Sequence, residues 1–319
     1  MLRRWVFFVL RKLGVLAVTM LVSSLVIFLA LYLAPGDPAT AIAGGTKPNP
    51  ENLARIRAEY HLDDPWWSQY LNWLHGILTG DMGTSLVYKT DVSTLISDRV
   101  LSTTLLVTYA GTLILVLGIG LGMLAGLRGR TTRTVINALT TVAMGAPTFV
   151  VAIILIALFA TTVDWFPIYG TGSGLVDRLW HLTLPAIALS LSYVAYVATV
   201  TRAAVDEEKV SEHVETAVSR GTPQRLITRR HVLRNAVAPI LTVSGLSIAG
   251  LFAGTAVAEQ AFGVNGIGSL LVDAAARKDL AVVQVISLFM VAAFVVVNTV
   301  IDAVNALLDP RTALEGAEA

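Results

Sequence analysis

The stretch ETAVSRGTPQRLITRRHVLRN, residues 215–235, differs in character from the chain on both sides of it. It carries five arginines and one acid, and a Gly-Thr-Pro interrupts it in the middle. Long apolar runs flank it at 182–200 and 236–258. A basic segment between two such runs indicates a connection that lies outside the apolar part of the fold.

The residues before Gly221 predict a helix with one apolar face. Apolar side chains recur there at the i, i+4, i+7, i+8 spacing of a helical stripe, at Val210, Val214, Ala217 and Val218. The acids at 206–208 lie near the expected start of this helix and Arg220 at its end. That order of charges suits the helix dipole.

The middle of the stretch predicts a sharp turn. Gly221 stands where a helix end wants a left-handed residue. Thr222 is a good N-cap, and Pro223 suits the first helical position. We therefore expect a helix, a turn and a second helix that runs into the next apolar run. A solvated loop whose helices lie on lipid headgroups is the alternative.

The rest of the chain is rich in apolar runs. Of its 319 residues 55% are hydrophobic and only 14% charged, and the mean hydropathy is +0.70. A charge facing lipid costs roughly 2.5–3.5 kcal/mol, which explains so few charges. A membrane helix needs about 20 mostly apolar residues. Six runs qualify, which predicts an all-α integral membrane protein with six transmembrane helices: 13–33, 101–127, 135–163, 182–200, 236–258 and 280–308.

The distribution of Lys and Arg predicts the orientation. With the N-terminus inside, the inside segments hold fifteen of these residues and the short outside loops hold three. Both termini and the 206–234 segment are then cytoplasmic. The first run is too long for a signal peptide, and more spans follow it.

The segment after the first run predicts a small extracytoplasmic subdomain. It begins with the turn-forming LAPGDPA (33–39) and continues with two short helical patterns. In the second pattern, aromatic residues gather at helical spacing, at Trp66, Trp67, Tyr70 and Trp73. Such residues suit the boundary between water and lipid. A peptide-binding surface is the alternative.

Two features of the second and third runs concern helix packing. Gly118, Gly122 and Gly126 are four residues apart on one helical face, a spacing that lets two membrane helices approach closely. They lie inside an apolar run and are therefore not a phosphate loop. Pro147 lies within the third run, where we expect a kink.

The sequence lacks recognisable motifs for catalysis, nucleotide binding or metal binding. It has no cysteine, no Walker A motif and no cluster of histidines and carboxylates, so we expect no cofactor, metal or catalytic residue in this chain. The net charge of +1 gives no indication of nucleic-acid binding. The five histidines are interpreted as surface or structural residues. Polar residues near the ends of the last two spans are candidates for the bundle interior or a solute path: Glu259, Asn298, Asp302 and Asn305.

Five sequence segments and one loop resemble those of a known family. The segment with Glu215, Ala217 and Gly221 resembles the cytoplasmic "EAA" loop of ABC importer permeases, although Leu233-Arg234 replaces the Leu-Pro that many of them have. LAPGDPA, GDMGTSL (80–86), the segments 179–205 and 258–284, and NALLDPR (305–311) resemble the dipeptide, oligopeptide and nickel branch. The resemblance extends over nearly the whole chain, and within this branch the chain is most similar to the B-type permease.

The resemblance implies a type I importer permease fold in a bacterial cell membrane. Its expected parts are a tail and first helix (1–34), an extracytoplasmic subdomain (35–100), a five-helix core (101–310) with coupling helices at 206–234, and a cytoplasmic tail (311–319). It also implies a coupling site for an ATPase subunit, formed by nine residues: Glu215, Thr216, Ala217, Val218, Gly221, Thr222, Pro223, Arg229 and Arg230.

The resemblance further implies the partners and the task. The partners are a homologous second permease, two ATPase subunits that bind ATP and Mg, an extracytoplasmic solute-binding protein and membrane lipid. The task is import of dipeptides or oligopeptides, or alternatively of nickel or another small solute. Two other classes of membrane protein are the alternatives. A secondary transporter would need a coupling-ion site, often acids at mid-span or broken helices in paired repeats. A membrane enzyme would need a catalytic constellation. The sequence offers neither convincingly.

Overall fold

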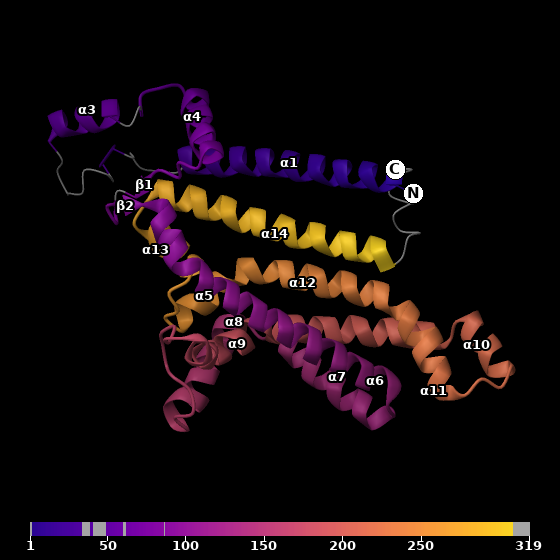
Figure 1. Cartoon of the computed structure of the whole chain (residues 1–319). Coiled ribbons are helices and arrows are strands. Elements are labelled where there is room, and N and C mark those ends of the chain that lie inside the picture. Colours follow the sequence, from indigo (N-terminus) through magenta and orange to yellow (C-terminus); the bar gives the residue numbers. More distant parts are fainter. Residues whose placement is uncertain (1, 34–38, 41–48, 60–61, 86, 309–319) are drawn as a thin grey trace. The chain divides into compact units, whose positions relative to one another are not determined.

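The computed structural model describes residues 2–33, 39–40, 49–59, 62–85 and 87–308 (Figure 1). These residues are almost all helical, as predicted, with one two-stranded antiparallel ribbon of β1 (Thr84–Ser85) and β2 (Thr90–Asp91). Much of the LAPGDPA segment, His61 and the predicted tail 311–319 lie outside the described residues. The chain forms two compact units, Met1–Thr103 with Asn265–Ala293 and Thr104–Val264 with Phe294–Ala319.

The first unit contains the aromatic cluster that the sequence predicts. Its helices include α1 (Leu2–Tyr32), α3 (Pro50–Glu59) and α4 (Trp66–Thr79). Helix α4 packs against α1, where the Phe28 ring lies 5.4 Å from the Tyr70 ring and 6.1 Å from the Trp73 ring. The Ser24 and Tyr70 hydroxyls are 2.9 Å apart. Part of the predicted interfacial patch is therefore helix-packing surface, while Trp66 and Trp67 remain exposed.

The first unit also contains a short helix that the sequence analysis did not identify. Helix α13 (Ile267–Ala276) packs with the start of α14 (Leu280–Leu308) and of α5 (Val92–Leu113) around buried Leu270 and Ile286. The buried Asp279 carboxylate accepts a hydrogen bond from Ser85 at the junction of α13 and α14. This bond ties the β-ribbon to the junction.

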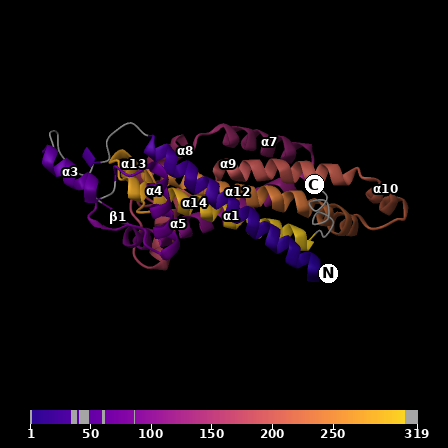
Figure 2. The same cartoon turned by 90° about the horizontal axis from the view of Figure 1, so that it is seen from above.

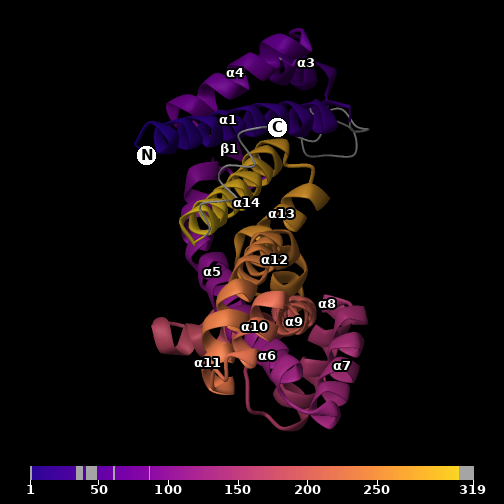
Figure 3. The same cartoon turned by 90° about the vertical axis from the view of Figure 1, so that its right-hand side faces the viewer.

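The second unit is built around one long helix. Helix α9 (Leu175–Lys209) contacts α6 (Ile119–Leu127), α7 (Arg130–Gly145), α8 (Thr148–Leu155) and α12 (Leu233–Ala261) (Figure 3). Two π-helical segments, η1 (Ile114–Gly118) and η2 (Ile156–Thr162), follow α5 and α8. Between α9 and α12 lie α10 (Glu212–Ser219), α11 (Gln224–Ile227) and the π-helical η3 (Thr228–Val232).

The predicted glycine face is the contact between α6 and α9. A Cβ on Gly122 would lie 2.5 Å from the Cβ of Thr201 and 2.6 Å from the Ala198 carbonyl oxygen. A Cβ on Gly126 would lie 2.8 Å from Val205. Only glycine permits so close an approach of the two helices, which confirms the packing interpretation.

Five helical stretches of the described chain are long and apolar enough to cross a membrane: Arg11–Tyr32, Val92–Leu127, Leu175–Lys209, Gln224–Ala261 and Leu280–Val304. The predicted third span is instead broken into α7 and α8–η2, which meet at 106°. If this bent pair is one span, the number becomes six.

The break in the third run lies at Pro147. Ala146 and Pro147 have extended ψ angles of 115° and 139°, because a proline disfavours helix at the residue before it and lacks an N–H. The Ser192 hydroxyl of α9 lies 3.2 Å from both the Ala143 and the Ala146 carbonyl oxygens, so it can donate to groups that the break releases. The expected kink is thus a full helix break.

Candidate functional site

Residues 211–232, here called the elbow, project beyond the ends of α9 and α12 (Figures 1 and 2). The chain leaves α9 at Lys209, forms α10, turns back and enters α11, η3 and α12. The predicted order of helix, turn and helix is therefore confirmed. All of the elbow lies within the second unit.

The start of α10 differs from the prediction. Helix α9 remains helical through 206–208, so these acids lie at its C-terminal end and not at the start of α10. Val210 falls in the turn between the helices and is 75% exposed, so it does not belong to the apolar stripe. The turn forms at Ser211, whose hydroxyl donates to the Glu208 carbonyl at 2.7 Å and whose carbonyl accepts from the Val214 N–H at 3.0 Å.

The turn at Gly221 has the geometry that the sequence predicts. Gly221 has a φ of 71°, in the left-handed region. Its N–H donates to the Val218 carbonyl at 2.9 Å, and the Thr222 N–H donates to the Ala217 carbonyl at 3.1 Å. These two bonds form a Schellman motif, which satisfies the last carbonyls of α10.

The predicted cap of the second helix is wrong by one residue. Pro223, and not Thr222, is the N-cap residue of α11, because its carbonyl accepts from the Leu226 and Ile227 N–H groups at 2.8 and 3.1 Å. The Thr222 N–H is part of the Schellman motif that ends α10, so α11 begins one residue later than predicted.

A separate hydrophobic cluster fixes the elbow to the two long helices. Val214 and Ala217 of α10, Ile227 of α11 and Val232 of η3 are all buried. They pack with four residues of α9 and α12: Ala204, Val205, Ala236 and Ile240. The inner face of α10 is therefore closed by these contacts, and its other face is available to a partner.

The outer surface of the elbow carries most of the predicted coupling residues. Glu215, Thr216, Val218, Gly221 and Pro223 are exposed, and Val218 has an exposed fraction of 55%. Arg229 and Arg230 are exposed on η3. Ala217 is buried, and Thr222 is half-buried. The structure thus divides the predicted set into an outward surface and an inward anchor.

A second group of charged residues was not singled out from the sequence. Arg133 of α7 pairs with Asp206 of α9 at 2.8 Å, and Lys209 donates a hydrogen bond to the Gly126 carbonyl at the end of α6. Acids at a helix C-terminus oppose the helix dipole. Arg133 offsets this unfavourable position of Asp206, and the two contacts together join the ends of α6, α7 and α9.

The polar candidates on the last two spans do not form one site among the described residues. Glu259 on α12 is fully buried. Asn298 is half-buried and Asp302 exposed on α14, and the side chain of Asn305 lies outside the described residues. Nearby, α14 approaches α12 closely, because a Cβ on Gly245 would lie 2.4 Å from the Ile301 side chain.

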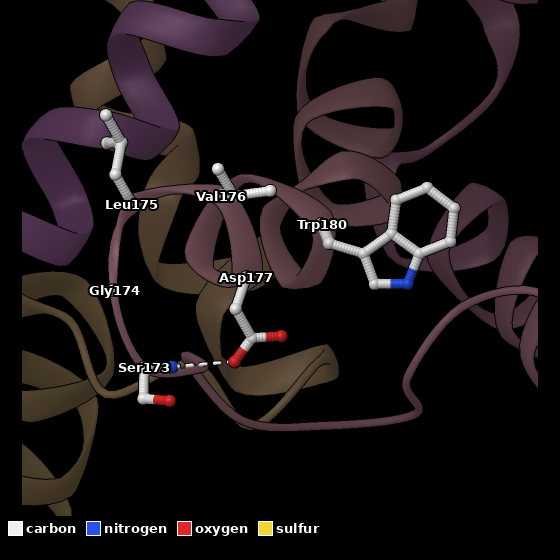
Figure 4. Close-up of a pocket in the computed structure, with 6 residues that line it drawn as sticks. All are labelled: Ser173, Gly174, Leu175, Val176, Asp177 and Trp180. Carbon is white, nitrogen blue, oxygen red and sulfur yellow. Dashed lines mark hydrogen bonds between the residues drawn. The ribbon is translucent and has the colours of Figure 1, made fainter.

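An open hollow of about 550 Å³ lies at the start of α9, lined by Ser173, Gly174, Leu175, Val176, Asp177 and Trp180 (Figure 4). The Asp177 carboxylate turns toward the backbone and accepts from the Ser173 N–H at 2.7 Å. His181 Nδ1 lies 2.9 Å from the Asp177 carbonyl oxygen. His181 Nδ1 also lies 3.3 Å from the Asp177 carboxylate, so both side chains make contacts within this local turn. No group of His, Asp and Glu side chains in the described part of the chain could hold a metal ion.

The long apolar helices, the glycine-packed bundle and the polar elbow define a multi-pass helical membrane protein. Family comparison makes this class specific. The model of the binding-protein-dependent transport system inner membrane component matches residues 118–314, and the model of the N-terminal part of such membrane components matches residues 1–107. The chain belongs to this family and is a multi-pass protein of the bacterial inner membrane. It is a permease component of ABC importers and not their ATPase.

Curated relatives match over nearly their full length. A probable peptide ABC transporter permease of Sinorhizobium fredii is 34% identical over 308 residues, which cover 95% of this chain and 98% of the relative. The oligopeptide transport system permease OppB of Salmonella typhimurium has the same identity and coverage. OppB of Escherichia coli is 33% identical over 306 residues. The resemblance seen in the sequence is thereby confirmed.

The fold is similar to that of a solved ABC transporter. A structure of the MetNI methionine ABC transporter in inward-facing conformations gives a TM-score of 0.52 at 14% identity. The match covers 68% of this chain and 97% of that one. At this identity the likeness concerns the fold alone.

Proposed function

We propose that the chain forms half of the translocation pathway of an ATP-driven importer of dipeptides or oligopeptides. The observation that carries the proposal is the full-length similarity to permeases named for peptides, at 33–34% identity. The elbow supports the coupling part of the function, since it presents an exposed surface on a rigidly packed base.

The elbow would dock in a groove of an ATPase subunit. Val218 lies on the exposed side of α10, one turn before the Gly221 cap, and Glu215 and Thr216 lie on the same helix. Arg229 and Arg230 would face the partner's acidic rim or lipid headgroups. When the ATPase closes on ATP and Mg, it would move α10, and the buried cluster would carry that movement to α9 and α12. The ATPase can shift the permease between two conformations only if it binds the docked elbow with a different affinity in each of them.

The topology supports this arrangement. We infer six spans with the bent pair counted as one, both termini in the cytoplasm, and an extracytoplasmic segment over 35–100. The Lys and Arg distribution supports an elbow on the cytoplasmic side, where an ATPase could reach it. The five-helix core then spans 101–310, with the coupling helices within 206–234 and the tail 311–319 after it.

The complete transporter would contain four further subunits. A homologous second permease would complete the pathway, two ATPase subunits would bind ATP and Mg, and an extracytoplasmic solute-binding protein would deliver the peptide. Glu259, Asn298 and Asp302 stay candidates for the pathway or the bundle interior. Nickel or another small solute is the second candidate cargo, because the family branch that the sequence resembles includes such importers.

Uptake assays separate these cargoes. A strain that lacks this permease is supplied with labelled dipeptides, longer peptides and nickel, and uptake is compared with that of the complemented strain. We expect peptide uptake to return with complementation and to require the ATPase subunits. Nickel uptake alone would reassign the cargo. Uptake that survives without the ATPases would indicate a secondary transporter.

A further inference from the structure

The root of the elbow contains a polar cluster that the apolar packing does not include. The Asn235 side-chain nitrogen lies 2.9 Å from His213 Nε2 and 3.4 Å from Glu208 Oε2. Glu208 Oε2 is itself 3.3 Å from His213 Nε2, and the Ser211 hydroxyl lies 3.3 Å from the same nitrogen. We call Glu208, His213 and Asn235 the root triad.

The root triad joins three helices at one point. Glu208 belongs to the last turn of α9, His213 to the first turn of α10 and Asn235 to the first turn of α12. The His231 ring of η3 lies 6.1 Å from the His213 ring, tilted by 37°. His213 thus contacts the end of α9 and the start of α12 through polar atoms, and its ring lies near that of His231 in η3.

The hydrogen bonds of the triad are directional, whereas the contacts of the hydrophobic cluster are not. Val214 and Ala217 anchor α10 through small apolar contacts, which are not directional. Helix α10 has eight residues, and a helix so short is not stable on its own. Hydrogen bonds depend on angle as well as distance, so they fix the rotation of α10 about its axis.

The donor and acceptor groups of the triad are complementary. A neutral imidazole accepts at Nε2 from the Asn235 amide N–H groups. A protonated imidazole donates at Nε2 to Glu208 or to the amide oxygen after the amide turns over. His213 thus has Glu208 and Asn235 as bonding partners, and the His231 ring lies beside it.

We propose that His213 is a positioning residue of the elbow, which locks α10 to the end of α9 and the start of α12 so that a movement of α10 reaches both spans. The inference rests on the proposed function, since it assumes that an ATPase moves α10. Without the triad, α10 would still dock through its outer face but would turn on its apolar base. ATP would then be hydrolysed with less transport.

The test measures coupling in the complete transporter. The two permeases, the ATPases and the binding protein are reconstituted in liposomes, and peptide uptake and ATP hydrolysis are recorded together. For His213→Ala we expect the ATPases to remain bound and uptake per ATP to fall about two- to fivefold, the range of one lost hydrogen bond between partly exposed groups. His213→Gln, which keeps an acceptor for Asn235, restores most of the loss. The matched control is His75→Ala, an exposed histidine on α4, which leaves the ratio unchanged.

Two further outcomes would overturn the inference. If uptake per ATP in His213→Ala equals that of the wild type, the triad does not position the elbow. If His213→Ala releases the ATPases, the residue belongs to the docking surface. Should this variant fail to reach the membrane, Asn235→Ala removes the same bond from the other side, and the same two outcomes apply. Wild-type permease that never binds the ATPases would instead refute the proposed function.

Discussion

The Thr222 N–H donates to the Ala217 carbonyl at 3.1 Å and closes the last turn of α10 onto Gly221. Ala217 is buried against α9 and α12, so this bond ties the turn to the base of the elbow. This hydrogen bond requires the left-handed φ of 71° at Gly221. The direction in which the chain leaves α10 therefore depends on a residue without a side chain.

Gly221→Val tests that dependence. The left-handed conformation costs an L-residue about 1–2 kcal/mol, and a β-branched side chain is among the least suited to it. We expect the variant to insert in the membrane but to bind the ATPase subunits more weakly, measured by co-purification. Gly129→Val is the control, because Gly129 has a φ of −67° and open space around it. Normal assembly and transport in the Gly221 variant would refute the elbow geometry.

Gly122→Ala tests the contact between α6 and α9. The added Cβ would meet the Ala198 backbone carbonyl at 2.6 Å, and backbone cannot move aside as a flexible side chain can. Overpacking of this kind costs about 1–3 kcal/mol. We expect a lower melting temperature of the detergent-purified protein. Gly120→Ala is the matched control, since a Cβ there meets nothing within 4 Å. Equal melting temperatures of the two variants would contradict the close packing.

The ion pair of Arg133 and Asp206 contributes less to stability than the close contact at Gly122. The two side chains are 45% and 27% exposed, and pairs of this kind are worth at most about 1 kcal/mol. Arg133→Ala should therefore lower thermal stability only slightly, and less at high salt. The exchanged double variant, Arg133→Asp with Asp206→Arg, should recover part of the loss. A large effect that does not depend on salt would mean that Arg133 acts through other contacts.

The local features of the fold were readable from the sequence. Apolar runs, the Gly118–Gly122–Gly126 spacing and the Gly221 turn each depend on neighbours along one helix or turn. The exact helix ends were not. The acids at 206–208 suggested a helix start, but the structure keeps them in α9, where Arg133 offsets the charge of Asp206. Arg133 is far from Asp206 in the sequence, and no local pattern reveals such a partner.

In the candidate site, too, local features could be predicted from the sequence and contacts with distant segments could not. The sequence identified the elbow and predicted an apolar stripe on α10. Only Val214 and Ala217 of that stripe are buried, while Val210 and Val218 are exposed, because α9 and α12 decide which part of the stripe is covered. The root triad was missed since its three members look like ordinary polar residues near helix ends. For Pro147 the sequence predicted a bend. Its size of 106° could not be predicted, because α7 and α8 each pack against α9, which follows later in the sequence.

The most direct test of the account is a crosslink from the outer face of α10 to the ATPase. The chain has no cysteine, so Val218→Cys introduces a single thiol at a position that is 55% exposed. Val214→Cys places the control thiol one turn earlier on the inner face, where the exposed fraction is 5%. In membranes that contain the complete transporter, a thiol-to-amine crosslinker should join the Val218 variant to an ATPase subunit and leave the Val214 variant unjoined. Crosslinks from other cytoplasmic positions but none from position 218, or labelling of that thiol from outside the cell, would contradict the account.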